Sequence, residues 1–226
     1  MPRLLDGPRL PPQSGTAKHL VVFLHGYGAD GNDLIDLGAN WAELLPDAAF
    51  VSPHAPEPCG MSPMGRQWWE LTFRDPSERW RGVNKAAPDL DHFLDTELQR
   101  HGLGPDKLAL VGFSQGTMMA LHVGLRRAVP PAAIVGYSGH LVQPENAPDG
   151  HLKSEVKGKP PVLLVHGDQD NVIPVTALFD AMGAFGKADI PCQWHLSLGV
   201  AHGIDPGGLR HGGQFIAQNL GLKLPG

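Results

Sequence analysis

Short apolar runs alternate with amphipathic stretches along most of this chain. The runs suited to buried strands are residues 19–24, 48–51, 108–111, 132–137, 161–165 and 193–198. The stretches with apolar residues at helical spacing are 32–45, 88–101, 117–126, 175–186 and 209–220. Strands that alternate with helices predict an α/β fold, with a mostly parallel central sheet and helices on both of its faces.

Two segments interrupt this alternation. The first residues are rich in Pro and Gly, so the stretch 3–10 predicts at most a short edge strand or hairpin. The segment 54–83 carries seven Pro or Gly residues among several aromatic ones. Loops of this length inside a compact domain are usually binding loops or lids. We therefore expect a single domain over residues 1–226, with 54–83 forming an irregular loop over or beside the active site.

Composition narrows the possible partners and the compartment. The chain has 226 residues, 42% of them hydrophobic, which is enough for one sizeable core, and its formal net charge is -5. A net negative charge does not indicate the basic surface that binds nucleic acid. The aliphatic and aromatic run 20–24 is far shorter than the ~20 residues that a membrane-spanning helix needs. We expect a soluble, cytoplasmic protein with no nucleic-acid partner and no integral membrane segment.

The cysteines and histidines do not indicate a metal centre. Cys59 and Cys192 are far apart in unrelated contexts, so we expect free thiols in a reducing compartment. The chain has 12 histidines, but none lies in a metal-ligand motif with partner carboxylates. No metal and no diffusible cofactor are predicted.

A candidate nucleophile follows the apolar run 108–111. The sequence Gly112-Phe113-Ser114-Gln115-Gly116 leads from this expected strand directly into an expected helix. In that setting a G-x-S-x-G motif is a nucleophile elbow, a tight turn that exposes the serine hydroxyl above the sheet. Ser114 is therefore the candidate nucleophile. Ser138 also follows a strand but lacks the elbow spacing, so we expect an ordinary strand-end hydroxyl.

A base and an acid follow two later strands. A serine hydroxyl needs a histidine to take its proton and a carboxylate to orient that histidine. Asp168 and Asp170 come after the run 161–165, and His202 comes after the run 193–198. The chain order Ser, Asp, His is the order of the α/β-hydrolase triad.

Four motifs in this order resemble a known family. They are residues 24–28, 112–116, 166–170 together with Pro174, and 201–203. The chain resembles the α/β-hydrolase superfamily, and within it the phospholipase/carboxylesterase branch that includes bacterial family VI esterases and acyl-protein thioesterases. The resemblance covers essentially residues 17–220.

The resemblance implies a role for each motif residue. It makes Ser114 the nucleophile, His202 the general base and then acid, and Asp170 the residue that orients His202. The family pattern H-G-x-x-D-x-x-V-P selects Asp170 over Asp168, although this chain has Ile where the pattern has Val. The implied oxyanion hole consists of the backbone N–H groups of Tyr27 and Gln115.

Three functions are compatible with these motifs. The first is a serine carboxylesterase that hydrolyses short- to medium-chain esters, a small-molecule substrate class, through an acyl-enzyme on Ser114. Trp68, Trp69 and Met64 are the candidate substrate-binding residues, because bulky side chains in the loop would shorten the pocket. The second is an acyl-protein thioesterase or lysophospholipase with long acyl substrates. The third is a catalytically silent ligand-binding protein of the same fold. Both a monomer and a homodimer fit the sequence.

Overall fold

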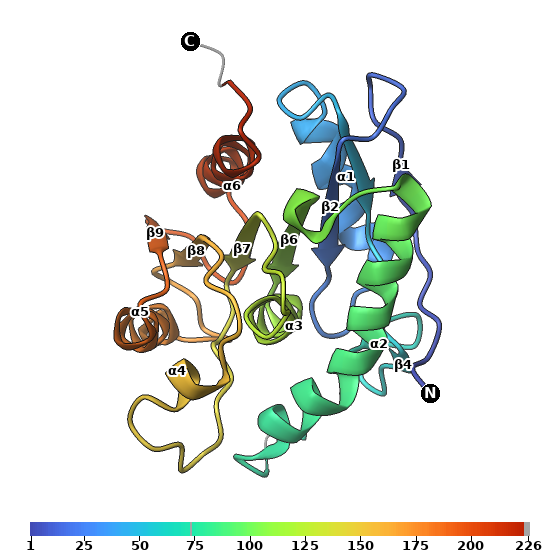
Figure 1. The fold of residues 1–226 in the computed structure, drawn as a ribbon. Coiled ribbons are helices and arrows are strands. Elements are labelled where there is room, and N and C mark those ends of the chain that lie inside the picture. Colours follow the sequence, from blue (N-terminus) through green and yellow to red (C-terminus); the bar gives the residue numbers. More distant parts are fainter. Residues whose placement is uncertain (73, 224–226) are drawn as a thin grey trace.

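The fold is organised around a seven-stranded sheet (Figure 1). The computed structural model describes residues 1–72 and 74–223. The strand order is β1-β3-β2-β6-β7-β8-β9, and only β1 is antiparallel to its neighbour. The strands are β1 (Arg9–Leu10), β2 (His19–Leu24), β3 (Ala48–Val51), β6 (Leu108–Phe113), β7 (Ala133–Tyr137), β8 (Val162–Gly167) and β9 (Cys192–Ser197). The predicted mostly parallel sheet and the predicted short edge strand near the N-terminus are confirmed.

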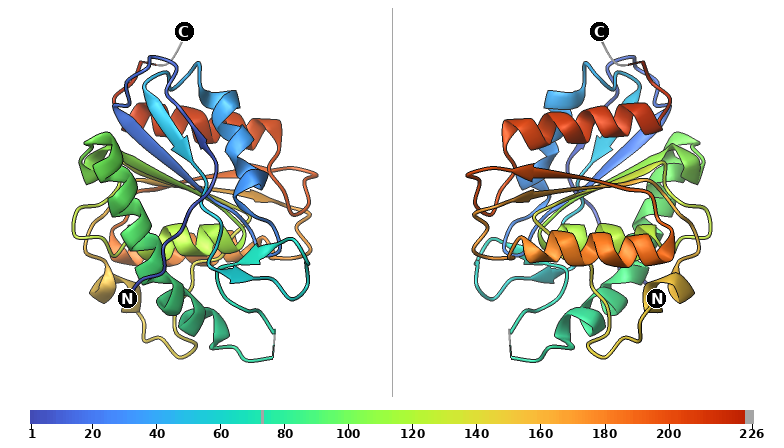
Figure 2. Two further views of the ribbon diagram at one scale, coloured as in Figure 1. Left: turned by 90° about the vertical axis from the view of Figure 1, so that its right-hand side faces the viewer. Right: turned by 90° about the vertical axis from the view of Figure 1, so that its left-hand side faces the viewer.

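Helices cover both faces of the sheet (Figure 2). They are α1 (Gly31–Trp41), α2 (Glu78–His101), α3 (Gln115–Gly124), α4 (His151–Glu155), α5 (Thr176–Ala188) and α6 (Pro206–Asn219). The helices α1 and α6 lie on one face, where Leu34 and Phe215 join one apolar cluster. The helices α2, α3 and α5 lie on the other, where Leu90 and Leu178 join a second cluster. The predicted layering on both faces is thereby confirmed.

The parallel strands bring distant segments to one edge of the sheet. The strands β2, β6, β7, β8 and β9 all run in the same direction, so the loops after them leave at the same edge. In open α/β sheets this carboxyl edge is where ligands bind. The glycine turn after β2, the elbow after β6 and the loops after β8 and β9 therefore lie together.

The segment 54–83 is less irregular than expected. It contains a two-stranded ribbon, β4 (Glu57–Pro58) paired with β5 (Arg66–Gln67), and its last residues belong to α2. The expectation of a helix starting at residue 88 is wrong, because α2 begins at Glu78 and contains Pro88. An interior proline removes one helical hydrogen bond. Here the buried face that includes Val83 and Ala86 extends through the proline and offsets that loss.

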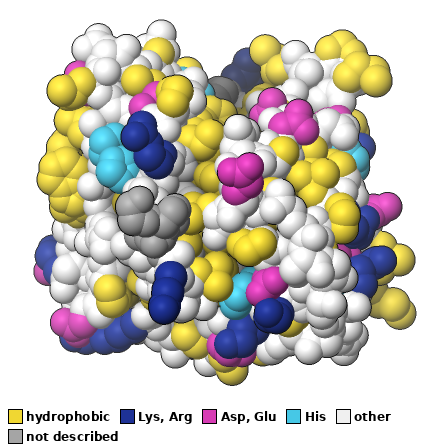
Figure 3. Space-filling model, turned by 90° about the horizontal axis from the view of Figure 1, so that it is seen from above, with side chains coloured by type: hydrophobic (Ala, Val, Ile, Leu, Met, Phe, Trp, Pro, Cys, Tyr) yellow, Lys and Arg dark blue, Asp and Glu magenta, His cyan; other side chains and the backbone are white. Residues whose placement is uncertain are grey.

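The surface carries charges of both signs. Basic and acidic side chains are interspersed with apolar ones on the face in Figure 3. No helix within residues 1–72 and 74–223 combines the length and the hydropathy that crossing a membrane requires. The expectation that residues 1–226 form a single domain stays a prediction.

Candidate active site

The turn at Ser114 is a strained nucleophile elbow. Ser114 has a φ of 54° and a ψ of -115° between β6 and α3, a conformation that non-glycine residues rarely adopt. A Cβ on Gly116 would lie 1.8 Å from the carbonyl oxygen of Leu24, and one on Gly112 would lie 2.4 Å from the nitrogen of Thr117. Both glycines of the G-x-S-x-G motif are therefore required by close backbone approach.

Asp170 and His202 form a direct pair. Nδ1 of His202 lies 2.8 Å from Oδ2 of Asp170. An ionised carboxylate only accepts hydrogen bonds, so Nδ1 carries the proton and donates it. The other ring nitrogen, Nε2, is then the basic one. This is the tautomer that a general base next to a serine needs.

Several donors stabilise the Asp170 carboxylate. Its side chain is fully buried, and Oδ1 accepts hydrogen bonds at 2.9 Å from the backbone N–H groups of both Val172 and Ile173. Burial raises the pKa of Asp170, but the bond from His202 and the two backbone bonds outweigh it and hold the pKa below its usual value. Asp170 is thus ionised at neutral pH.

His202 lies against the residue before the nucleophile. The ring centroids of Phe113 and His202 are 4.9 Å apart, which places the imidazole beside the elbow. The glycine turn after β2 also lies next to Ser114, because a Cβ on Gly26 would lie 3.3 Å from the Cβ of Ser114. The structure therefore brings the four predicted motifs together.

Two backbone N–H groups, at the start of α3 and in the glycine turn, make no backbone hydrogen bond in the described part of the chain, and their role as oxyanion donors stays a prediction. Gln115 is the first residue of α3, so its N–H has no partner within the helix. Tyr27 follows β2 in the glycine turn, and its N–H makes none of the backbone hydrogen bonds seen in the described part of the chain. Burial, followed by a hydrogen bond with Cys59, raises the pKa of the Tyr27 phenol to about 12, so the phenol is neutral.

The two loop tryptophans lie in the core and not on a pocket wall. Trp68 is 0% exposed and Trp69 is 2% exposed, and both belong to the apolar cluster beneath α2. A Cβ on Gly82 would lie 2.2 Å from the Trp69 ring, so this indole packs directly on the helix. Met64 is 88% exposed. Substrate binding by these three residues stays a prediction, and the burial of the tryptophans favours a packing role.

Three further polar residues, Asp168, His166 and Ser138, hold loops at this edge of the sheet. Asp168 accepts a hydrogen bond from the N–H of Gly199 at 2.6 Å, so it bridges the loops after β8 and β9. Nε2 of His166 lies 2.8 Å from the carbonyl oxygen of Ile173. Ser138 has a φ of 44° and its hydroxyl donates to the carbonyl of Gly203 at 3.3 Å, behind the loop that carries His202.

His25 is a structural histidine. It is fully buried; Nε2 accepts a hydrogen bond from the N–H of Ala55 at 3.0 Å, and Nδ1 lies 2.7 Å from the carbonyl oxygen of Gly26. Nδ1 therefore carries the proton and donates to Gly26. Burial lowers the pKa of His25 to about 4, so the ring is neutral at physiological pH.

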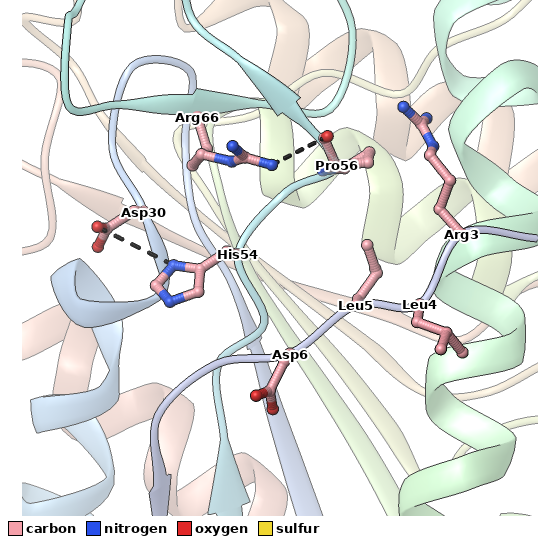
Figure 4. A pocket seen from close by; sticks show the side chains of 8 residues that line it. All are labelled: Arg3, Leu4, Leu5, Asp6, Asp30, His54, Pro56 and Arg66. Carbon is pink, nitrogen blue, oxygen red and sulfur yellow. Dashed lines mark hydrogen bonds and ion pairs between the residues drawn. The ribbon is translucent and has the colours of Figure 1, made fainter.

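Two cavities lie near the site. A cavity of about 190 Å³ touches the loop after Asp170, and its lining includes the apolar residues Met118, Ile173 and Ala177 and the polar residues Arg79, His140 and Asp180. A larger hollow of about 610 Å³ lies between the N-terminal segment and the glycine turn (Figure 4). In this hollow Arg66 already donates to the carbonyl oxygens of Ala55 and Pro56, at 2.8 and 2.9 Å.

Nothing in the described residues forms a metal centre. Across residues 1–72 and 74–223, no three His, Cys, Asp or Glu side chains come together as ligands would. Cys59 and Cys192 are both free thiols, the first buried and the second half-buried.

Comparison with known proteins identifies the family. Residues 6–220 match the family described as phospholipase/carboxylesterase. The chain belongs to that family. The resemblance inferred from the sequence, the α/β-hydrolase fold and the carboxylic ester hydrolase class are confirmed.

Relatives of this phospholipase/carboxylesterase family member include esterases and thioesterases. The solved structure of esterase PE8 is 44% identical, with a TM-score of 0.90 over 96% of this chain and 99% of that one. Esterase YpfH of Escherichia coli is 26% identical over 92% of this chain and 84% of its own length. Acyl-protein thioesterase 1 of Schizosaccharomyces pombe is 30% identical over 81% and 83%.

Some site contacts had no signal in the sequence. The side chain of Gln115 contacts the backbone of the 54–83 segment, and the ring of Phe113 contacts His202. The motif assigned Gln115 only through its N–H, which every residue except proline possesses. A side-chain role for it depends on which segment folds over the elbow, and only the structure shows that.

Proposed function

We propose that this protein is a serine carboxylesterase that forms an acyl-enzyme on Ser114. The observation that carries the proposal is the 2.8 Å pair between Asp170 and His202 next to a serine held at a φ of 54°. Nucleophile, base and orienting acid come from the ends of three strands at one edge of the sheet. The relationship to proteins named as esterases supports the same activity.

The chemistry proceeds in two halves. His202 Nε2 takes the proton of the Ser114 hydroxyl as its oxygen attacks the ester carbonyl, and Asp170 stabilises the resulting imidazolium. The N–H groups of Tyr27 and Gln115 stabilise the oxyanion. The imidazolium gives its proton to the leaving alcohol, and the acyl-enzyme forms. Water then attacks the acyl-enzyme with the same proton transfers, and the carboxylic acid and the serine hydroxyl are released.

The acyl group is short to medium in length. The cavity beside the loop of Asp170 measures about 190 Å³. A long chain in this cavity would contact Arg79, His140 and Asp180 in its lining, and burying these polar groups against methylenes costs free energy. Small esters therefore fit this site best.

A second candidate function is thioester hydrolysis. The same triad serves thioesters, and one relative at 30% identity is named acyl-protein thioesterase 1.

A cytoplasmic location and a monomeric or homodimeric state complete the proposal.

The test combines covalent labelling with a substrate series. The wild type and Ser114→Ala are incubated with a fluorophosphonate, adducts are mapped by mass spectrometry, and p-nitrophenyl esters from acetate to palmitate are assayed beside an acyl thioester. We expect one adduct on Ser114, an optimum at short or medium chains, and a loss in Ser114→Ala on the order of 10⁴-fold or more. A long-chain or thioester optimum would favour the second candidate. Wild-type activity in Ser114→Ala would refute the assignment of the nucleophile.

A further inference from the structure

The side chain of Gln115 is buried and makes two hydrogen bonds to one segment. Oε1 accepts from the backbone N–H of Trp68 at 2.9 Å, and Nε2 donates to the backbone carbonyl of Trp69 at 2.9 Å. Gln115 is 0% exposed. Its side-chain amide therefore hydrogen-bonds to the backbone of the segment Arg66–Trp69 through both its oxygen and its nitrogen, as the backbone of a neighbouring strand would.

The same segment is bonded to the glycine turn. The N–H of Gly28 donates to the carbonyl of Arg66 at 2.9 Å, and the N–H of Arg66 donates to the carbonyl of Ala29 at 2.7 Å. Nε1 of Trp68 donates to the carbonyl of His25 at 3.1 Å. These bonds hold the backbone on both sides of Tyr27.

The far side of the segment is also anchored. The Arg66 guanidinium donates to the carbonyls of Ala55 and Pro56, and the bond to Pro56 is drawn in Figure 4. A Cβ on Gly65 would lie 2.1 Å from the carbonyl oxygen of Gly28, so the segment lies directly against the glycine turn. The segment is thus a rigid bridge between the turn and the elbow.

We propose that Gln115 is a positioning residue, whose side-chain amide fixes the spacing between its own N–H and the N–H of Tyr27. The two oxyanion donors come from loops after different strands, and the segment Arg66–Trp69 is bonded to both. The inference rests on the proposed function, because it concerns the donors of that reaction. It assigns a role to the Gln115 side chain that is separate from the role of its backbone.

Two substitutions test this role while every backbone N–H stays in place. Gln115→Leu removes both side-chain bonds at similar volume, and Gln115→Glu retains the acceptor for Trp68 but turns a carboxylate oxygen toward the carbonyl of Trp69. Gln214→Leu is the matched control. It makes the same change at a half-buried glutamine in α6, on the opposite face of the sheet from α3.

Kinetics are measured per active site, titrated with a fluorophosphonate. Removing an oxyanion donor outright costs about 10²–10³-fold in kcat, so misplacing the donors in Gln115→Leu should lower kcat by about 10- to 100-fold with KM nearly unchanged. The Ki of a trifluoromethyl ketone, which forms a tetrahedral adduct on the serine, should rise in parallel. Gln214→Leu should keep the wild-type kcat. A kcat in Gln115→Leu within about threefold of wild type, or an equal loss in Gln214→Leu, would overturn the proposal.

Gln115→Glu provides a second readout if Gln115→Leu folds poorly. A protonated glutamate can both accept from Trp68 and donate to Trp69, whereas the ionised form cannot donate. Burial raises the folded-state pKa of such a glutamate, so its stability is present at low pH and lost as pH rises through that pKa. The difference in Tm between Gln115→Glu and the wild type should narrow from pH 8 to pH 5. A constant difference would contradict the proposal that both side-chain hydrogen bonds of Gln115 hold the segment. Wild-type activity in Ser114→Ala would instead refute the underlying function.

Discussion

Nδ1 of His202 lies 2.8 Å from Oδ2 of Asp170, whereas Asp168, two residues earlier, accepts from the N–H of Gly199. The two carboxylates share one loop after β8 but face different neighbours. The one that meets the imidazole is fully buried and receives two backbone N–H bonds besides. The geometry therefore separates the carboxylate that contacts His202 from the one that bridges two loops.

This separation predicts opposite outcomes for two matched substitutions. Asp170→Asn keeps the shape but removes the charge that fixes the His202 tautomer, so kcat should fall on the order of 10³–10⁴-fold. Asp168→Asn retains an oxygen that accepts from Gly199, so its kcat should stay near that of the wild type. Steady-state kinetics with p-nitrophenyl acetate measure both. A larger loss in Asp168→Asn than in Asp170→Asn would reverse the two roles.

Motif and spacing predicted the sheet and the contact between Asp170 and His202, because those features depend on patterns that can be read in the sequence. The catalytic roles of the triad stay a prediction. The buried strand β6 is a continuous apolar run, and the glycines around Ser114 are fixed by backbone clashes at 1.8 and 2.4 Å. Such constraints leave residue types that can be recognised in a sequence. The order of strands then brings the base and the acid to the same edge.

The features that the sequence did not predict depend on tertiary contacts. The helix α2 extends through Pro88 because its first turns pack on Trp69, a residue that comes before the helix in the chain. The sequence makes Trp68 and Trp69 candidates for substrate binding, because bulky side chains in that loop would shorten a pocket. Whether such an indole faces a ligand or the core depends on what covers it, and here α2 does.

The glycines of α3 and α5 should respond in opposite ways to alanine. Gly116→Ala would place a Cβ 1.8 Å from a backbone oxygen that cannot move without displacing β2, so we expect an unfolded or inactive protein. Gly183 lies inside α5 with open space around it. Gly183→Ala should raise the free energy of unfolding by about 0.5–1 kcal/mol, because alanine loses less backbone entropy in a helix. Urea denaturation measures both, and destabilisation by Gly183→Ala would contradict the packing described.

Acid should destabilise the fold through its buried histidines. His122 is 3% exposed, its Nδ1 has no hydrogen-bond partner among the described residues, and burial followed by the charge of Arg126 lowers its pKa to about 3. In the unfolded chain the His122 imidazole binds a proton below about pH 6.5, whereas in the folded chain it stays neutral down to about pH 3. The free energy of unfolding therefore falls as pH drops from about 6.5 toward 3, by up to about 1.4 kcal/mol per pH unit for this residue. His25, with a pKa of about 4, adds to the same trend.

The substitution His122→Leu tests this dependence. It removes one of the titrating groups, so the free energy of unfolding should fall less steeply between pH 6.5 and 4.5 than in the wild type. The difference should reach about 2 kcal/mol at pH 4.5. Urea denaturation at several pH values provides the measurement. Parallel curves for the two proteins would show that His122 does not titrate on unfolding.

The polar side of the cavity near Asp170 should set the acyl-chain preference. His140 lines this cavity together with Met118 and Ile173, and burial lowers its pKa, so it is a neutral polar group on the cavity wall. His140→Leu replaces it with an apolar surface, and each additional methylene buried is worth about 0.8 kcal/mol, so kcat/KM for an octanoate ester should rise about 3- to 10-fold relative to acetate. His101→Leu, at the end of α2 and outside the cavity lining, is the matched control. An unchanged ratio of octanoate to acetate hydrolysis in His140→Leu would show that acyl groups bind elsewhere.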